Sequence, residues 1–284
     1  MRTTAPSVLR PRAQHALSML VGKWNRTGDR TRFYVATLSS IPHAVVRYRA
    51  EILRLIAQMG LGVGALAVIG GSVVIIGMLT LTTGALVAVQ GYNQFQAVGV
   101  EALTGAASAF FNPRVIQLGT ITVALAATIG AGATAELGAM RINEEIDALE
   151  VMGIRAVAYL TSTRVVAGVI VVIPLWCVGL FTAYGAARIG TTAIYGQGSG
   201  VYDHYFNTFL HTADLVWSLS EIVAVTLIIM LIHTFRGYHA AGGPAGVGDA
   251  VGVAVRTSMS VASLAIVMMV LAVYGQDGNI RLAG

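Results

Sequence analysis

The chain has 284 residues, of which 56% are hydrophobic and only 11% are charged, and its mean hydropathy is +0.74. Soluble globular domains carry about 25% charged residues, so this composition excludes that class and predicts an integral membrane protein. The net charge of +5 arises from basic residues clustered beside apolar runs, without interleaved exposed aromatics, so we expect membrane lipids with anionic headgroups as partners and no nucleic acid. The single cysteine, Cys177, excludes a disulfide framework or a thiol-metal cluster.

The first 43 residues form a basic arm. Ten of the eighteen Lys and Arg residues precede residue 55, against only Asp29 and Glu51. Positive charge beside the first span predicts a cytoplasmic N-terminus. The arm lacks the apolar core and small-residue cleavage site of a signal peptide, so we expect it to persist in the mature protein.

Residues 44–60 have the spacing of an amphipathic helix. One face is apolar and the opposite face is polar, as expected for a helix that lies in the membrane interface with its basic side on headgroups. The apolar face comprises Val45, Tyr48, Ile52, Leu55, Ile56 and Met59, and the polar face Arg47, Glu51, Arg54 and Gln58.

Residues 61–284 form the membrane domain, with five predicted spans. No charged residue occurs from 55 to 100, and the polar stretch 90–96 is expected to end the first span. The predicted spans are residues 61–89, 115–135, 165–187, 215–235 and 257–276. The fold class is therefore all-α, with an interfacial helix, five transmembrane helices and a short cytoplasmic helix.

The distribution of basic residues fixes the predicted orientation. With the N-terminus inside, the cytoplasmic segments 1–60, 141–164 and 236–256 hold fifteen Lys and Arg residues, and the outer segments hold three. This bias follows the positive-inside rule and predicts a multi-pass protein of the plasma (inner) membrane, with the C-terminus extracytoplasmic.

Glycines recur every seven residues in the first predicted span. On a helix this spacing keeps them on nearly one face, which lets another backbone approach closely. Such a stripe indicates either a tight contact beside a cavity or ordinary helix packing. Its members are Gly70, Gly77, Gly84 and Gly91.

The connector between the second and third spans contains a cluster of acidic residues. Its four carboxylates fall within seven positions, and the apolar residues Ile142, Ile146 and Leu149 share one helical face. We expect a short helix over about 142–152, capped by Asn143 and stopped by Gly153. The acids are Glu144, Glu145, Asp147 and Glu150. From composition alone this segment is either a docking surface or a solvated connector.

Two carboxylates fall at or within the apolar spans, where burial of a charge is costly. Glu136 lies near the cytoplasmic end and is expected to reach water or to pair with Arg141. Glu221 lies within the fourth span and is expected to contact a neighbouring subunit or to line a route through the membrane.

A polar group on the outer side also allows an alternative function. Its members could belong to a membrane-embedded metal-dependent or hydrolytic enzyme, although scattered polar residues in an outer loop more often face water or a docked partner. They are Asp203, His204, His211 and Asp214. We expect no metal site. A structural scaffold is a further alternative.

The segment ELGAMRINEEIDALEVMGIRAVAYLTSTR, followed by RVVAGVIVVIPL, resembles the signature loop of the MlaE/YrbE family of lipid-transporting ABC permeases. The resemblance continues through GALVAVQGYNQF and FRGYHAAGGPAGVGDAVGVAVRTSM and covers roughly residues 45–276. It implies that the acidic connector is a cytoplasmic coupling helix that docks into a groove on an ATPase, with the acids facing polar or basic groups and Ile146 and Leu149 packing into the groove.

The chain has no Walker motif of its own: GGPAGVGD at 242–249 contains no lysine. We therefore expect a transport subunit that is not an enzyme and binds no cofactor, with ATP and magnesium on a separate ABC subunit.

The resemblance also implies a lipid cavity between two permease copies, walled by the first, second and fifth spans and opening outward. The corresponding residues here are Leu86, Val89, Gln90, Tyr92 and Arg114. Arg114 is followed by Val115 where the family's bacterial outer-membrane members carry glutamate. Residues 127–130 stand in place of their Gly-Arg-Ala-Gly block, and Ile266 in place of an aspartate of their last span.

Fewer charges predict a less polar cavity, suited to a fatty acid, sterol or phospholipid, or a partner permease that supplies the missing groups. These departures and the basic arm are most similar to a YrbE-type subunit of an actinobacterial Mce system. Such a system implies a heterodimer with a second YrbE-type permease and MCE-domain proteins on the outer (periplasmic) side.

Overall fold

The computed structural model describes residues 28–62 and 71–275, which are helical apart from short connections and contain no strand within those ranges. Five continuous helical runs are long and apolar enough to cross a membrane. They are Gly71–Gln96, Glu101–Ile142, Val157–Ile194, Thr212–Tyr238 and Gly243–Tyr274. The predicted fold class is confirmed.

The first span, α5 (Gly71–Gln96), continues through the polar stretch 90–96 that was expected to end it. Polarity marks where apolar surroundings end, whereas a helix continues as long as its backbone hydrogen bonds do. Tyr92 in this extension stacks on Tyr195, with ring centroids 4.4 Å apart. The chain turns only at Gly99, whose φ of +73° is accessible to glycine without strain.

The second span is a single helical run that begins at Glu101, well before the predicted residue 115. At about 1.5 Å per residue, its 42 residues extend roughly 63 Å, twice a hydrocarbon core of about 30 Å, so the run must project beyond the membrane. Its parts are η2 (Glu101–Leu103), α6 (Thr104–Phe111), the π-turn η3 (Asn112–Ile116), α7 (Gln117–Leu125), the π-turn η4 (Ala126–Gly130) and α8 (Ala131–Ile142).

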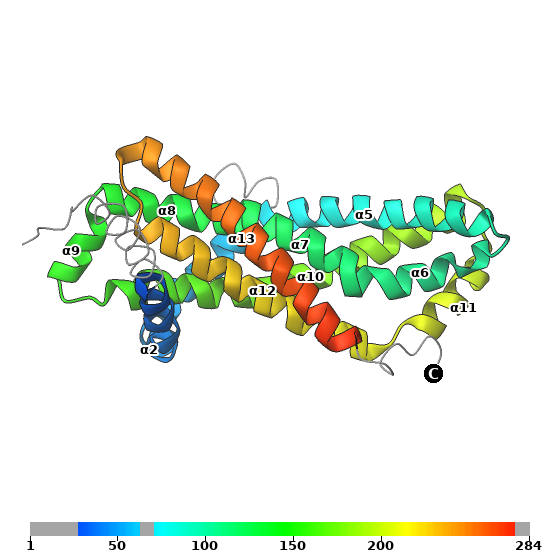
Figure 1. Cartoon of the computed structure of the whole chain (residues 1–284), viewed down its shortest axis with the longest axis horizontal. Coiled ribbons are helices and arrows are strands. Elements are labelled where there is room, and N and C mark those ends of the chain that lie inside the picture. Colours follow the sequence, from blue (N-terminus) through cyan, green and yellow to red (C-terminus); the bar gives the residue numbers. More distant parts are fainter. Residues whose placement is uncertain (1–27, 63–70, 276–284) are drawn as a thin grey trace, which may run out of the picture.

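The third span is central to the bundle. Its main helix α10 (Thr163–Ile189) packs against α5, α12 (Thr212–Tyr238) and the N-terminal α3 (Arg49–Leu61), while α13 (Gly243–Tyr274) lies over α12 and α8 (Figure 1). The π-turns η5 (Val157–Ser162) and η6 (Gly190–Ile194) flank α10.

Close backbone approach and polar contacts hold these helices together. Lipid tails are as apolar as leucine side chains, so the hydrophobic effect gives little drive for helix association inside a membrane. A Cβ on Gly84 of α5 would lie 2.3 Å from the Ala183 carbonyl oxygen of α10. Beside this contact, the Thr80 and Thr182 hydroxyls are 2.6 Å apart. The glycine therefore sets the distance between α5 and α10.

The N-terminal region is helical from residue 28 and lies at one end of the bundle. A helix over 28–39 is followed by α2 (Ile41–Arg47), which Figure 1 shows turned across the long axis, and by α3. Ile52, Leu55 and Met59 of the predicted apolar face are buried within the chain, but Val45 is 41% exposed. The helix breaks at Tyr48 (φ −117°, ψ 38°), which rotates Val45 away from that face.

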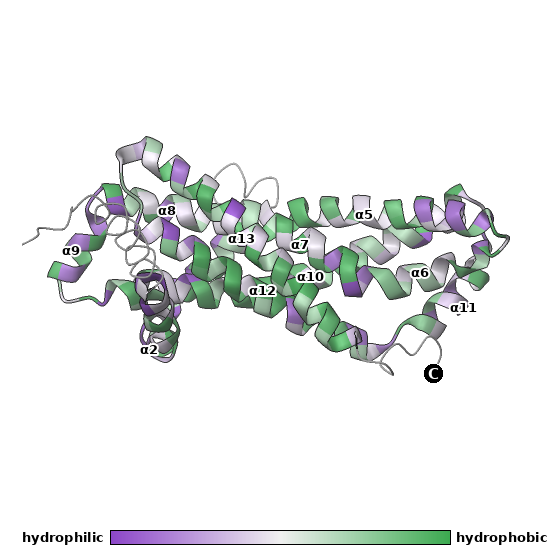
Figure 2. Ribbon diagram, viewed as in Figure 1, coloured by the Kyte–Doolittle hydropathy of each residue, from purple (hydrophilic) through white to green (hydrophobic). Residues whose placement is uncertain are grey.

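Polar residues gather toward the two ends of the elongated bundle and apolar residues fill its middle (Figure 2). The short helix α9 (Glu145–Val151) lies at one end, with α2, while α6 and α11 (Ser199–Phe209) lie at the other (Figure 1). The acidic connector and the N-terminal helices over 28–61 therefore share one end of the bundle.

Candidate functional site

The acidic helix α9 is anchored to the bundle through Ile146. This side chain is fully buried and packs with Leu137, Ala156 and Leu160, with Leu149 partly buried beside them. The expectation that Ile146 enters a groove on a partner is therefore wrong, because its own chain covers it. Ile146 instead fixes α9 against α8 and the start of the third span.

The start of α9 also differs from the prediction. Asn143 closes α8, and Glu144 precedes α9 in a left-handed conformation with φ of 60°. Glu144 is the one non-glycine residue with positive φ in 28–62 and 71–275. Gly153 does follow the end of the helix, and its φ of +75° permits the chain to turn there.

All four acids of the connector are exposed, but they are not equivalent. Asp147 pairs with Arg141 at 2.6 Å, and Glu150 accepts a 2.9 Å hydrogen bond from the Tyr238 hydroxyl. The carboxylates of Glu144 and Glu145 make no hydrogen bond or ion pair to any described residue. These two charges are the most available to a partner.

Two exposed apolar residues at the end of α9 were missed from the sequence. Val151 is 88% exposed and Met152 is 66% exposed. The helical spacing places both away from the Ile146 face, so the pattern contained the signal. Exposed apolar side chains beside unpaired charges form an amphipathic surface of the kind that docks against another protein.

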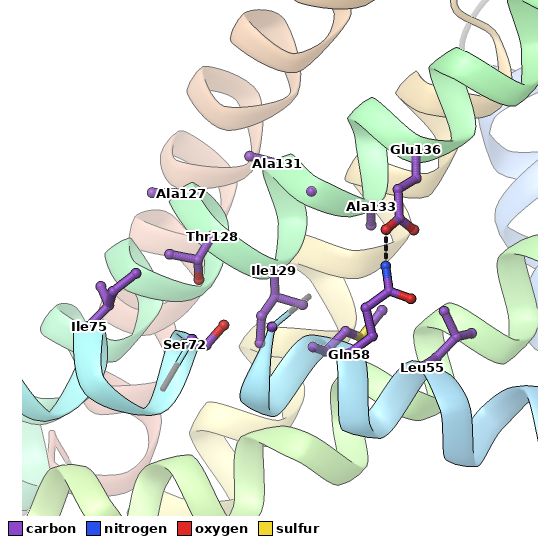
Figure 3. Close-up of a pocket in the computed structure, with 14 residues that line it drawn as sticks. Leu55, Gln58, Ser72, Ile75, Ala127, Thr128, Ile129, Ala131, Ala133 and Glu136 are labelled. Carbon is purple, nitrogen blue, oxygen red and sulfur yellow. Dashed lines mark hydrogen bonds between the residues drawn. The ribbon is translucent and has the colours of Figure 1, made fainter. Parts of the chain in front are cut away.

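Glu136 is paired within the chain, but not with Arg141. Its Oε2 lies 3.2 Å from Nη2 of Arg164 on α10, and its Oε1 accepts a hydrogen bond from the Gln58 amide of α3. This contact joins α3, α8 and α10 and lies at the edge of a pocket of about 320 Å³ (Figure 3). Ser72, Thr128 and Ile129 also line that pocket.

The residues assigned to the lipid pathway fall into two groups. Leu86, Val89 and Gln90 are exposed on α5, whereas Tyr92 is stacked on Tyr195. Arg114 is 4% exposed and is directed into the fold, where its Nη2 lies 2.7 Å from Asp214.

The Arg114 guanidinium also lies between two aromatic rings. Its Cζ is 3.6 Å from the ring centroid of Phe110 and 4.8 Å from that of Tyr274. Three separate helical runs therefore meet at this arginine.

An apolar pocket of about 200 Å³ lies between the C-terminal end of α5 and the helices α6 and α11. Aromatic rings from α5, α6 and α11 dominate its lining. The residues are Phe95, Leu103, Ala106, Ala107, Phe110, Phe111 and Phe209. A pocket with this lining suits a hydrocarbon chain.

The glycines of the stripe differ in how closely another helix approaches them. Gly84 makes the close backbone contact described above, and a Cβ on Gly91 would lie 3.3 Å from Thr104. Around Gly77 the nearest atom would be 3.9 Å away, and Gly70 lies outside the described residues. Among the described glycines of the stripe, Gly84 therefore makes the closest contact, at the crossing of α5 and α10.

The two aspartates of the predicted polar group pair with two different arginines. Arg188 donates two 2.8 Å hydrogen bonds to Asp203 and holds the pKa of that carboxyl below its usual value, so it is ionised at neutral pH. Asp214 is paired with Arg114, and no set of three potential metal ligands occurs in the described ranges. These contacts give the enzyme hypothesis no support.

Glu221 is 3% exposed, and neither carboxylate oxygen has a hydrogen-bond partner among the described residues. It lies two turns along α12 from Asp214, on the same face.

A family model described as Permease MlaE matches residues 63–273. The chain belongs to the MlaE permease family. Among curated proteins it is similar to a probable ABC transporter permease of Rickettsia felis, with 27% identity over 82% of this chain and 90% of that protein. A probable ABC transporter permease of Rickettsia bellii is 28% identical over 63% of this chain and 69% of that protein.

A more distant relative is the chloroplastic protein TRIGALACTOSYLDIACYLGLYCEROL 1 of Arabidopsis thaliana. It is 26% identical over 64% of this chain and 52% of that protein. This MlaE-family chain is thus a multi-pass membrane protein and a permease subunit of an ABC transporter, which implies lipid transport and an ATP-binding partner.

Proposed function

We propose that this permease passes lipid through the plasma membrane under the control of a separate ATPase that docks on α9. The supporting observation is the α9 surface, where unpaired Glu144 and Glu145 lie beside exposed Val151 and Met152 while buried Ile146 fixes the helix to the bundle. A rigidly attached helix transmits a displacement of its partner to the spans on either side. ATP and magnesium bind to the partner.

The proposed orientation follows from the basic N-terminal helices. We place α9 and the N-terminus in the cytoplasm and the C-terminus outside, because the basic N-terminal helices lie at the α9 end. The opposite end, with α6 and α11, then faces MCE-domain proteins on the outer side of the membrane.

The lipid pathway is proposed to lie along α5 and the outer apolar pocket. On α5, Leu86 is 53% exposed and Val89 is 38% exposed. On α13, Leu264 is 65% exposed and Met268 is 61% exposed. A second permease copy is expected to close these faces around the lipid. We infer a different YrbE-type subunit, as in actinobacterial Mce systems, because this chain lacks charges that related cavities carry. The cargo is a fatty acid, sterol or phospholipid.

The ATPase contact is tested by charge reversal. The triple variant Glu144→Lys, Glu145→Lys, Glu150→Lys is expected to lose co-purification of the ATPase while remaining folded and monodisperse, with at most a small loss of stability from the Tyr238–Glu150 hydrogen bond. Glu101→Lys, at the opposite end of the bundle, is the control and should retain the ATPase. Equal ATPase recovery with the triple variant would overturn the docking site.

A separate variant with Val151→Asp and Met152→Asp tests the apolar part of the surface. Both side chains are exposed, so these substitutions remove no internal packing and should weaken ATPase binding without destabilising the permease.

The lipid pathway is tested by photocrosslinking. A photoreactive amino acid at Leu86 or Val89 should capture lipid in the assembled complex, and one at Val46, exposed on α2, serves as the control. Equal capture at Val46 would indicate bulk membrane lipid instead of a pathway.

A further inference from the structure

A basic pocket of about 540 Å³ lies at the end of the bundle that carries α9, between the helix over 28–39 and the last turn of α12. Three guanidinium groups, an imidazole, an aromatic ring and one carboxylate line it. The residues are Asp29, Arg30, Arg32, Phe235, Arg236 and His239. None of the three arginines forms an ion pair with another described residue.

The pocket is built on fixed elements. Phe33 is 8% exposed, and its ring centroid lies 5.3 Å from that of Phe235 and 5.4 Å from that of Tyr238. One turn further along, Thr37 is fully buried and its carbonyl accepts a 2.8 Å hydrogen bond from Ser162. The helix that carries Arg30 and Arg32 is therefore packed onto the bundle.

The orientation of the arginines is also partly set. The Arg30 Cζ lies 6.0 Å above the Phe235 ring, and Nδ1 of His239 lies 2.9 Å from the Phe235 carbonyl oxygen. Three guanidinium groups around one space repel one another unless an anion lies between them. Arginine binds phosphate oxygens with paired, planar hydrogen bonds.

The position favours a lipid as the source of this anion. The pocket lies where the apolar helix α12 ends at Tyr238, against the helix over 28–39 that precedes α2, so we place its opening at the level of the headgroups. Anionic phospholipids of the cytoplasmic leaflet attract basic groups at this level. A protein that docks on the acidic α9 is expected to present basic groups, so it does not supply the anion.

We propose that Arg30, Arg32 and Arg236 bind the phosphate of one anionic phospholipid, at a site separate from the transport pathway. The Asp29 carboxylate accepts hydrogen bonds from headgroup hydroxyls, as in a glycerol headgroup. The volume lies within the range of about 300–1,000 Å³ that is usual for small-ligand pockets. Because Tyr238 contacts both Phe33 and Glu150, a lipid here holds the N-terminal helix against α12 beside α9.

The site is tested by lipid binding to the full-length chain, purified with the subunits that accompany it, in neutral detergent. Phosphatidylglycerol, phosphatidylcholine and glycerol 3-phosphate are added separately, and binding is measured by native mass spectrometry. We expect one phosphatidylglycerol per chain at concentrations where phosphatidylcholine does not bind. The double variant Arg30→Gln, Arg32→Gln should weaken that binding by roughly 25-fold, about fivefold for each arginine.

The matched control is Arg47→Gln, Arg49→Gln, which removes two exposed arginines from α2 and α3 outside the pocket. It should leave the bound phosphatidylglycerol unchanged. If both double variants lose phosphatidylglycerol binding to the same extent, the attraction is diffuse electrostatics and the proposed site is overturned. If glycerol 3-phosphate binds as tightly as phosphatidylglycerol, the pocket is a site for a soluble phosphate and not for a lipid. If phosphatidylglycerol no longer binds once the ATPase is removed, the binding depends on the contact between the two proteins and not on the pocket alone.

At the third arginine, Arg236→Gln and Arg236→Lys distinguish an effect of the lost charge on binding from an effect of the substitution on folding. Lysine keeps the charge and should restore most of the binding that glutamine removes, although without the paired geometry. If Arg236→Gln does not fold, the N-terminal double still decides the outcome. Binding is measured without transport, so this result is independent of the proposed docking on α9.

Discussion

The Tyr238 hydroxyl donates a 2.9 Å hydrogen bond to Oε1 of Glu150, across 88 positions of the sequence. This contact joins the last turn of α12 to α9, and it is separate from the Ile146 anchor that joins α9 to α8. The acidic helix α9 is thereby connected to the fourth span as well as to the spans that flank it.

Tyr238→Phe should therefore reduce the lipid moved per ATP hydrolysed more than it reduces stability. The change removes one hydrogen bond to a charged acceptor at an exposed site, which costs about 1 kcal/mol or less. The ATPase should still bind, because Glu144 and Glu145 are untouched. The measurement is transport and ATP hydrolysis in reconstituted vesicles.

Tyr48→Phe is the control for Tyr238→Phe. The Tyr48 ring packs on Tyr159 at the same end of the bundle, and its hydroxyl makes no hydrogen bond within the described ranges. Unchanged coupling in Tyr238→Phe, or an equal loss in Tyr48→Phe, would show that the contact to Glu150 does not transmit motion.

Glu144 provides a test of backbone strain. A non-glycine residue in the left-handed region costs roughly 1–2 kcal/mol, and glycine relieves most of that cost. Glu144→Gly should thus be more stable than Glu144→Ala by about 1 kcal/mol, since both lack the carboxylate and only one relieves the strain. Thermal unfolding in detergent compares them, and equal midpoints would contradict a strained turn.

Because Arg114 and Asp214 form a buried ion pair, we expect the effects of substituting each of them on stability to be non-additive. Removal of one partner leaves an uncompensated buried charge, which costs about 3–5 kcal/mol. Arg114→Met and Asp214→Leu should each destabilise the chain strongly, and the double variant should recover most of the loss. A double variant no better than either single variant would mean that the packing of Arg114 on Phe110 and Tyr274 is the larger contribution.

Gly84 and Gly77 form a matched pair on one face of α5. Gly84→Ala places a methyl group against the α10 backbone at Ala183 and should destabilise the fold by about 1–3 kcal/mol or prevent assembly. Gly77→Ala meets ordinary van der Waals contacts near 3.9 Å and should be neutral or slightly stabilising. The yield and melting temperature of the two variants check this, and a reversal of their order would refute the crossing at Gly84.

Hydropathy and charge in the sequence were sufficient to predict the all-α class, the five spans and a short acidic helix ended by Gly153. These features depend on local properties, because each residue contributes its own transfer free energy and each helix its own periodicity. The same local signals placed the end of the first span too early, because they register loss of apolar character and not loss of helical hydrogen bonds.

The partners of individual side chains depended on the tertiary structure. The resemblance placed Ile146 toward another protein, whereas packing buries it. Glu136 was expected to reach water or to pair with Arg141; its side chain is 39% exposed, and its partners are Arg164 and Gln58. Likewise, Arg114 meets Asp214 only because two distant helical runs cross there. Which face a helix turns inward is set by the summed packing of all its neighbours, so the local pattern defined the helices and the assembled bundle determined what each side chain contacts.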